Sequence, residues 1–174
     1  MVGERVFIGL GSNLGDGPAI VSTAWQTIGE EARITTVAIS RPYVSSPVGM
    51  DSRHWFTNCV GELKTDLTAQ ELLRTLLGIE AAFGRTRDEN LTGYQDRVLD
   101  LDILYFGDLS LNEPGLILPH PRIAKRLFVL SPLAEIAPEW QGGGEVSVRQ
   151  MEQSLLDRMR RNQIPMQEIV CREW

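Results

Sequence analysis

Residues 98–118 read VLDLDILYFGDLSLNEPGLIL, and this stretch decides the class of fold. Apolar and polar side chains alternate from Leu99 to Ile103, which predicts a strand with one buried face. Gly107 and Asp108 predict a turn, after which residues 109–118 can return as the other arm of a hairpin. Because a hairpin joins antiparallel strands, the stretch favours an antiparallel sheet over strict alternation of strands and helices.

Patterns on either side add strands and helices to this sheet. A capping box from Thr68 to Glu71 opens one helix, and Asp16 followed by Pro18 opens another. Apolar periodicity predicts strands at 5–10, 35–46 and 56–64, and helices at 16–29, 68–84, 122–130 and 147–160. The resulting order predicts an α+β fold, most simply a ferredoxin-like two-layer sandwich with a mainly antiparallel sheet and flanking helices.

The composition is typical of one folded domain. The 174 residues are 43% hydrophobic and 23% charged, so we expect a single domain over 1–174. A net charge of −6 disfavours nucleic acid and anionic membranes as partners. Cys59 and Cys171 lack the spacing of a zinc site. The beginning of the chain lacks the pattern of an export signal, so we expect a cytoplasmic protein.

Asp100 and Asp102 form the sharpest candidate site. Residues i and i+2 of a strand point to the same face, which places the two carboxylates roughly 6 to 7 Å apart. Two hard oxygen ligands side by side suit Mg²⁺, which is commonly held by one or two carboxylates and by substrate phosphates. The alternative is a solvated strand face, because an isolated Asp-x-Asp is a weak motif.

Basic residues bracket the acidic pair along the chain. A site for a nucleoside triphosphate and its metal requires basic residues for the phosphates beside acidic residues for the metal. The residues concerned are Arg85, Arg87 and Arg97 before the pair, and His120, Arg122, Lys125 and Arg126 after it. The alternative is that the arginines solvate helix ends and that the histidine is structural.

Two further segments have both a structural and a functional interpretation. Gly11 to Gly15 lies between a strand and a helix, where backbone N–H groups could meet an anion, but a tight turn is the better interpretation. Phe56 and Asn58 could stack on a flat heterocycle and hydrogen-bond its edge, whereas strand alternation alone would bury Phe56 in the core. Phe128 has the same two interpretations.

Taken together, these segments resemble the 6-hydroxymethyl-7,8-dihydropterin pyrophosphokinase family of folate biosynthesis, also called 2-amino-4-hydroxy-6-hydroxymethyldihydropteridine diphosphokinase. The resemblance covers 7–139, and we expect 140–174 to be a C-terminal extension that packs on it. Its marks are IGLGSNLGD at 8–16, YVSSPVG at 43–49, FTN at 56–58, IEAAFGRTR at 79–87, RVLDLDILYFGD at 97–108 and LPHPRIAKRLFVLSPLAEIAP at 118–138.

The resemblance implies a kinase of the transferase class that moves pyrophosphate from ATP to a pterin hydroxymethyl group, giving AMP. It implies a monomer whose partners are ATP and the pterin, with two Mg²⁺ ions bound by Asp100 and Asp102. It assigns the remaining residues by position: Arg85 and Arg97 assist transfer; Arg87, His120, Arg122 and Arg126 bind ATP; Ser45, Pro47, Val48, Phe56, Asn58 and Phe128 bind the pterin; and Glu80 lies near the metal and pterin.

The chain departs from the family in one loop. The family has a Trp-Gly-Pro-Arg run where this chain has Tyr94-Gln95-Asp96-Arg97. We expect Tyr94 to replace the tryptophan, Asp96 to loosen the backbone, and 88–96 to become ordered when both substrates bind.

Two other functions remain open from the residues alone. A nucleotidyltransferase also uses a Gly-Ser turn and an Asp-x-Asp pair, although Ser12 lies far along the chain from Asp100. A non-catalytic ferredoxin-like regulatory module would need no convergence of arginine, histidine and aspartate.

Overall fold

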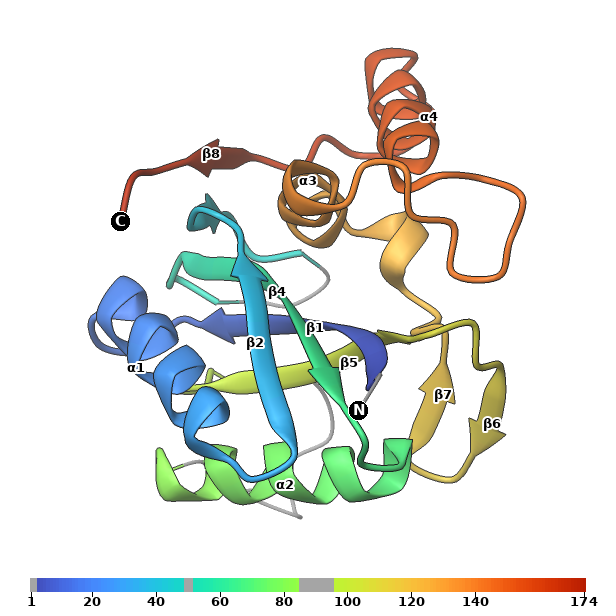
Figure 1. Ribbon diagram of the computed structural model, residues 1–174. Coiled ribbons are helices and arrows are strands. Elements are labelled where there is room, and N and C mark those ends of the chain that lie inside the picture. The colour runs from blue at the N-terminus through green and yellow to red at the C-terminus, as the bar shows by residue number, and fades with distance from the viewer. Residues whose placement is uncertain (1–2, 49–51, 85–95) are drawn as a thin grey trace.

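The computed structural model describes residues 3–48, 52–84 and 96–174 (Figure 1). Its main sheet has six strands in the order β5-β1-β4-β3-β8, and β2 also pairs with β4. The strands are β1 (Glu4–Ser12), β2 (Ile34–Ile39), β3 (Tyr43–Ser45), β4 (Phe56–Thr65), β5 (Asp100–Phe106) and β8 (Ile169–Cys171). Each of these pairings is antiparallel, which confirms the predicted α+β class.

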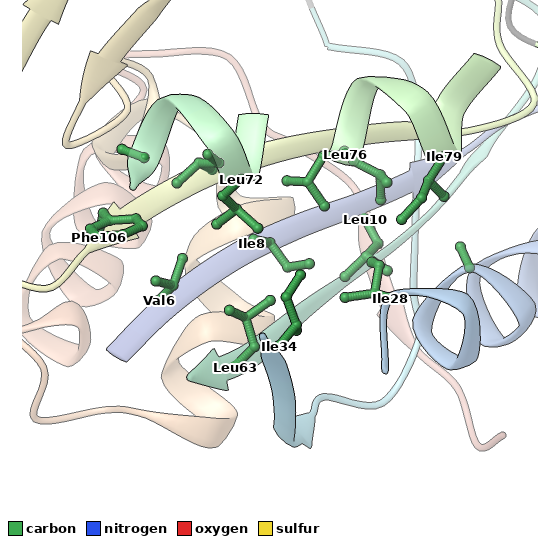
Figure 2. Close-up of a cluster of buried hydrophobic side chains, with 14 of the residues drawn as sticks. Val6, Ile8, Leu10, Ile28, Ile34, Leu63, Leu72, Leu76, Ile79 and Phe106 are labelled. Carbon is green, nitrogen blue, oxygen red and sulfur yellow. The ribbon is translucent and has the colours of Figure 1, made fainter. Parts of the chain in front are cut away.

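Helices α1 (Gly17–Glu30) and α2 (Ala69–Ala82) cover one face of the sheet (Figure 1). Both begin at their predicted caps. The Asp16 carboxylate accepts a hydrogen bond from the Ala19 N–H at 3.2 Å, and Thr68 and Glu71 form a reciprocal capping box. Figure 2 shows the core on this side, where Ile8 of β1 meets Leu72 and Leu76 of α2 and all three are fully buried.

The opposite face is covered by α3 (Leu127–Ile136), α4 (Val148–Arg160) and the short 3₁₀ helix η1 (Ile123–Lys125). Phe7 of β1 and Leu104 of β5 pack there against Leu130 of α3 and Leu155 of α4. Because both faces of β1 are covered, its side chains are apolar on both sides rather than alternating. The helix predicted at 147–160 is confirmed, and it packs on this second core.

The hairpin predicted for 98–118 is wrong in its pairing. β5 pairs with β1, whereas β6 (Leu111–Glu113) and β7 (Leu116–Leu118) pair with each other as a separate two-stranded sheet. Gly115, with φ of 84°, lies in the turn between them and adopts a conformation that favours glycine. The alternation of side chains predicts a strand correctly but does not identify its neighbour.

Two further element boundaries differ from the prediction. The segment 35–46 forms β2 and β3 rather than one strand, because Pro42 has no N–H for a ladder and separates two registers on the same partner, β4. The helix predicted at 122–130 is interrupted at Arg126, whose φ of −121° and ψ of 105° are extended. Sequence analysis did not predict β8. In the part of the chain that the structure describes, no helix is long and apolar enough to span a membrane.

Candidate active site

The register of three strands builds the candidate site. Gly11 of β1 lies between Asn58 of β4 and Asp100 of β5. Since neighbouring strands lie about 4.8 Å apart, the backbones of Asn58 and Asp100 are about 10 Å apart across this glycine. A Cβ atom at Gly11 would lie 3.4 Å from Asn58 Oδ1 and 4.0 Å from Asp100 Cβ. The glycine therefore leaves open a space between the amide and the carboxylate.

This space is part of a pocket whose empty volume, open solvent included, is about 690 Å³. The pocket brings together nine of the residues predicted for the site: Ser45, Val48, Phe56, Asn58, Arg97, Asp100, Asp102, Arg126 and Phe128. They come from β3, the loop after it, β4, β5, the loop before β5, and the start of α3. Phe56 lines the pocket instead of lying deep in the core.

A buried hydrogen bond fixes the Asn58 amide. Its Nδ2 atom donates to Ser45 Oγ at 3.0 Å, and the two residues are 7% and 1% exposed. With this donor engaged, the orientation of the amide is set before any ligand binds. Ser45 thus lines the pocket and also orients the group that would read the edge of a heterocycle.

The two aspartates lie in different electrostatic surroundings. Asp100 Oδ1 accepts from Arg97 Nη1 at 2.7 Å. Burial first, and then the negative charges of Asp100 and Glu80, raise the pKa of Asp102 to about 6. Glu80 is 2% exposed, and its Oε1 atom accepts from the Leu101 N–H at 2.7 Å, so it fixes the backbone between the two aspartates.

Asn13 holds Arg97 in place. Its Oδ1 atom accepts from the Arg97 N–H at 2.8 Å, and its own N–H donates to the Arg97 carbonyl at 3.2 Å. The tight turn predicted for Gly11 to Gly15 is only partly right: Gly11 and Ser12 end β1, and the bend at 13–15 that follows them supports the loop before β5. Sequence analysis missed this role because the contact joins positions far apart in the chain.

The expected loosening at Asp96 does not match the structure. The Asp96 Oδ1 atom accepts from Asn13 Nδ2 at 2.6 Å and from Ser52 Oγ at 2.7 Å. These hydrogen bonds, with the Ser52 bond the largest contribution, lower the pKa of Asp96. The side chain thus ties the loop before β5 to two other segments, which proline could not do.

His120 and Arg122 line a neighbouring hollow that shares Asp102 with the pocket. The His120 N–H donates to the Leu104 carbonyl at 2.9 Å, and His120 Nδ1 accepts from the Arg122 N–H at 3.1 Å. Burial, followed by the charges of Arg126 and Arg122, lowers the pKa of His120 to about 4. In the free protein at neutral pH the imidazole is therefore neutral, and Nε2–H is its available donor.

The remaining predicted residues lie elsewhere. Pro47 lines a third hollow, with Val48 and part of the C-terminal segment, rather than the pocket itself. Arg126 and Phe128 line the pocket together, and the Arg126 guanidinium carbon lies 5.5 Å from the centre of the Phe128 ring. Arg85, Arg87, Tyr94 and the 88–95 part of the loop predicted to become ordered lie outside the described residues.

The donor set at the two aspartates fits a divalent cation that is also held by a ligand. Asp100 and Asp102 present two hard oxygen donors, and with Glu80 they concentrate negative charge that a cation would neutralise. Within residues 3–48, 52–84 and 96–174, no group of three or more histidine, cysteine, aspartate or glutamate residues could hold a metal ion by itself. Phosphate oxygens and water would have to complete the coordination.

Comparison with known proteins identifies the family. The model of the 7,8-dihydro-6-hydroxymethylpterin-pyrophosphokinase (HPPK) family matches residues 7–138. The chain belongs to this family. The extent agrees with the predicted resemblance over 7–139, and the family is one of transferases.

Curated relatives in the HPPK family are similar over most of their length. A 2-amino-4-hydroxy-6-hydroxymethyldihydropteridine pyrophosphokinase of Methylorubrum extorquens is 40% identical over 141 residues, covering 81% of this chain and 87% of the relative. The protein of the same name from Bacillus subtilis is 40% identical over 133 residues, covering 76% of this chain and 78% of the relative.

Solved structures share the HPPK fold. The crystal structure of Plasmodium falciparum HPPK-DHPS wild type with pterin and p-hydroxybenzoate matches with a TM-score of 0.73 at 14% identity, covering 92% of this chain and 44% of that one. This chain therefore corresponds to less than half of that protein. At such low identity the likeness shows the fold alone, and it supports the predicted ferredoxin-like arrangement.

Proposed function

We propose that this chain transfers pyrophosphate from ATP to the hydroxymethyl group of 6-hydroxymethyl-7,8-dihydropterin, giving AMP and the pterin diphosphate, a step of tetrahydrofolate biosynthesis. Family membership supports the reaction. The observation that carries the proposal is the placement of Asn58 and Asp100 on opposite sides of Gly11. A group that binds a heterocycle and a carboxylate suited to a metal–phosphate complex thus share one pocket.

The proposed pterin site lies at the Asn58 side of the pocket. Phe56 and Phe128 would stack on the two faces of the flat ring, and the preset Asn58 amide would hydrogen-bond its edge. Ser45 and Val48 would line the same end, with Pro47 in the adjoining loop. This placement would leave the pterin hydroxymethyl group directed toward the two aspartates.

The proposed ATP site lies at the Asp102 side. Asp102 faces both the pocket with Arg97 and Arg126 and the hollow with His120 and Arg122, so phosphates placed across it would meet donors on both sides. By position in the family, Arg85 and Arg87 would complete this set. Positioning and charge neutralisation supply most of the catalysis in such transfers.

In the proposed reaction, the pterin hydroxyl oxygen forms a bond to the β-phosphorus of ATP. The bond between that phosphorus and the oxygen bridging it to the α-phosphate breaks, and AMP leaves with the bridging oxygen. The hydroxyl proton is released to solvent. Two Mg²⁺ ions held by Asp100 and Asp102 would neutralise charge on the phosphates. Arg97 and Arg126 would hold the transferred group in line with the hydroxyl.

The geometry also bears on the two alternatives. Convergence of Arg97, Arg126 and the aspartates in one pocket disfavours a regulatory module without catalysis. One observation favours the nucleotidyltransferase alternative: the Gly11-Ser12 pair lies close to the acidic pair in space, because Gly11 pairs with Asp100. However, the Asn13 amide in the bend after Ser12 is hydrogen-bonded to Arg97 and Asp96. This is expected of a segment that supports a neighbouring loop, not of a loop that binds phosphate.

Product analysis tests the proposal. The purified protein is incubated with ATP, Mg²⁺ and 6-hydroxymethyl-7,8-dihydropterin, and nucleotides and pterins are separated by chromatography. AMP with a diphosphorylated pterin is the expected result, and the folded Asp102→Asn variant is the control that should form neither. ADP would indicate simple phosphoryl transfer, and released pyrophosphate would indicate nucleotidyl transfer. Absence of any pterin-dependent product would refute an enzymatic role in this reaction.

We further propose that residues 1–174 act as one domain and as a monomer in the cytoplasm. β8, near the C-terminus, extends the sheet that contains β1, which supports a single folded unit.

A further inference from the structure

The segment after α4 returns to the candidate site and lies beyond the matched region, which ends at residue 138. β8 pairs with β3, and two backbone bonds flank this pairing. The Ser46 N–H donates to the Glu168 carbonyl at 3.1 Å, and the Arg172 N–H donates to the Pro42 carbonyl at 2.8 Å. The segment thus lies along the strand and loop that form one wall of the pocket.

One side chain of this segment, Gln167, reaches the break between η1 and α3, where Arg126 lines the pocket. Its Oε1 atom accepts from the Leu127 N–H at 2.8 Å, and its Nε2 atom donates to the Lys125 carbonyl at 2.8 Å. The residue between these two positions is Arg126. A single amide therefore holds the peptide groups on both sides of the arginine that lines the pocket.

The local sequence leaves these two backbone groups without a side-chain cap. Arg126 is the N-cap residue of α3, and its side chain makes no capping hydrogen bond. The first N–H groups of an α-helix have no partner within the helix and need one from elsewhere. Gln167 supplies this cap from 40 positions along the chain and also bonds the last carbonyl of η1.

The two hydrogen bonds from Gln167 affect the direction of the Arg126 side chain. Arg126 is a single extended residue between two helices, with φ of −121° and ψ of 105°. Small rotations about its two backbone bonds would swing the long guanidinium through several ångströms. Fixing the peptide groups before and after it restrains those rotations, and also the start of the helix that carries Phe128.

We propose that Gln167 is a positioning residue that aims Arg126 at the phosphates of ATP, so that the C-terminal segment is a working part of the nucleotide site. This inference rests on the proposed function, in which Arg126 binds ATP. A packing role alone would also place Gln167 here, but such a role would not single out nucleotide binding.

Two substitutions separate hydrogen bonding from packing. Gln167→Met keeps the length of the side chain but removes both hydrogen bonds, and Gln167→Ala removes the side chain. Both are expected to raise the dissociation constant of α,β-methylene-ATP with Mg²⁺ about tenfold, the order expected for loss of positioning by one or two hydrogen bonds. The Kd of the pterin should change less than about twofold. Glu168→Ala is the matched control and should change neither, because Glu168 is an exposed neighbour whose hydrogen bond to the described residues comes from its backbone carbonyl.

A double-mutant cycle tests the route through Arg126. In the Arg126→Ala background, Gln167→Met is expected to have no further effect on the Kd of the ATP analogue. Hydrogen exchange provides a measurement that needs no enzyme activity: the Leu127 amide should exchange about tenfold faster in Gln167→Met, while amides in the middle of α3 stay unchanged.

The outcomes are distinct. An unchanged nucleotide Kd in both Gln167 variants, recovery of binding in the methionine variant, or a full effect that persists without Arg126 would each overturn the positioning role. If the wild-type protein binds the analogue but forms no AMP with the pterin, the proposed function fails while the Gln167–Arg126 coupling is still measured. If the wild-type protein does not bind the analogue, both proposals fail.

Discussion

Replacement of Asp102 by asparagine is expected to stabilise the free protein and to abolish its proposed activity. Folding raises the pKa of this carboxyl from 3.8 to about 6, chiefly through burial and the charge of Asp100. The difference of about 2 units corresponds to about 3 kcal/mol of unfavourable free energy when the carboxyl is ionised. Because the Asp102 side chain, although largely buried, keeps some contact with solvent, we expect a smaller net effect of about 2 kcal/mol.

The raised pKa of Asp102 determines how the free energy of unfolding depends on pH. The folded state binds the additional proton, so this contribution to stability is present below about pH 4 and is lost as the pH rises through 6. Asparagine has no such titration. The variant should therefore exceed the wild type by about 2 kcal/mol at neutral pH, with a gap that approaches zero near pH 4.

Urea unfolding without nucleotide or metal at both pH values measures this gap. Asp108→Asn, an exposed carboxylate two residues after the same strand, is the matched control and should change stability by less than about 0.5 kcal/mol. A less stable Asp102→Asn protein at neutral pH, or a gap that does not shrink in acid, would refute the electrostatic reasoning. AMP formation by the stabilised variant would refute the catalytic role.

Three other predictions concern the elements around the pocket. Gly11→Ala places a methyl group 3.4 Å from the facing asparagine oxygen and should weaken pterin binding about tenfold in a titration, whereas Gly78→Ala, with nothing within 4 Å, should not. Asn13→Ala should lower kcat for AMP formation at least about tenfold with a smaller change in the pterin KM, because Arg97 loses its support; an unchanged kcat would contradict this. The lowered pKa of His120 contributes stability that is present above pH 6.5 and is lost as the pH falls through about 4. Glutamine does not titrate, so between these pH values the free energy of unfolding of His120→Gln should fall by about 1 to 2 kcal/mol less than that of the wild type. Unfolding curves measured at a series of acid pH values test this.

Local patterns predict the elements well because their causes are local. The capping residues Asp16, Thr68 and Ser147 mark the starts of α1, α2 and α4, where each side chain accepts a backbone hydrogen bond. The period of two along β5 likewise places Asp100 and Asp102 at one pocket. The pairing of strands, in contrast, cannot be predicted from local patterns. Side-chain alternation in 98–106 does not show that β1, far back in the chain, is the neighbour.

The supporting residues of the candidate site escape sequence reasoning for the same reason. Asn13 reads as part of a turn, and its bonds to Arg97 depend on two loops meeting across β1 and β5. Gln167 lies in a segment with no periodicity, and its role appears only once η1 and α3 are seen to break at Arg126. Gly11 is predicted to lie in a loop. In the structure it lies in β1 between β4 and β5, where the absence of a side chain leaves space between Asn58 and Asp100.

The pairing of β8 with β3 also bears on how the protein avoids aggregation. An uncovered strand edge offers its N–H and C=O groups to any other chain in solution. β8 covers the edge of β3, and the new edge is only three residues long, too short to template much further pairing. A chain shortened to the region shared with the family would expose β3 and would also uncover the apolar surface under α4. Such a fragment would be expected to associate through that edge, so the C-terminal segment keeps the protein dispersed as well as completing its fold.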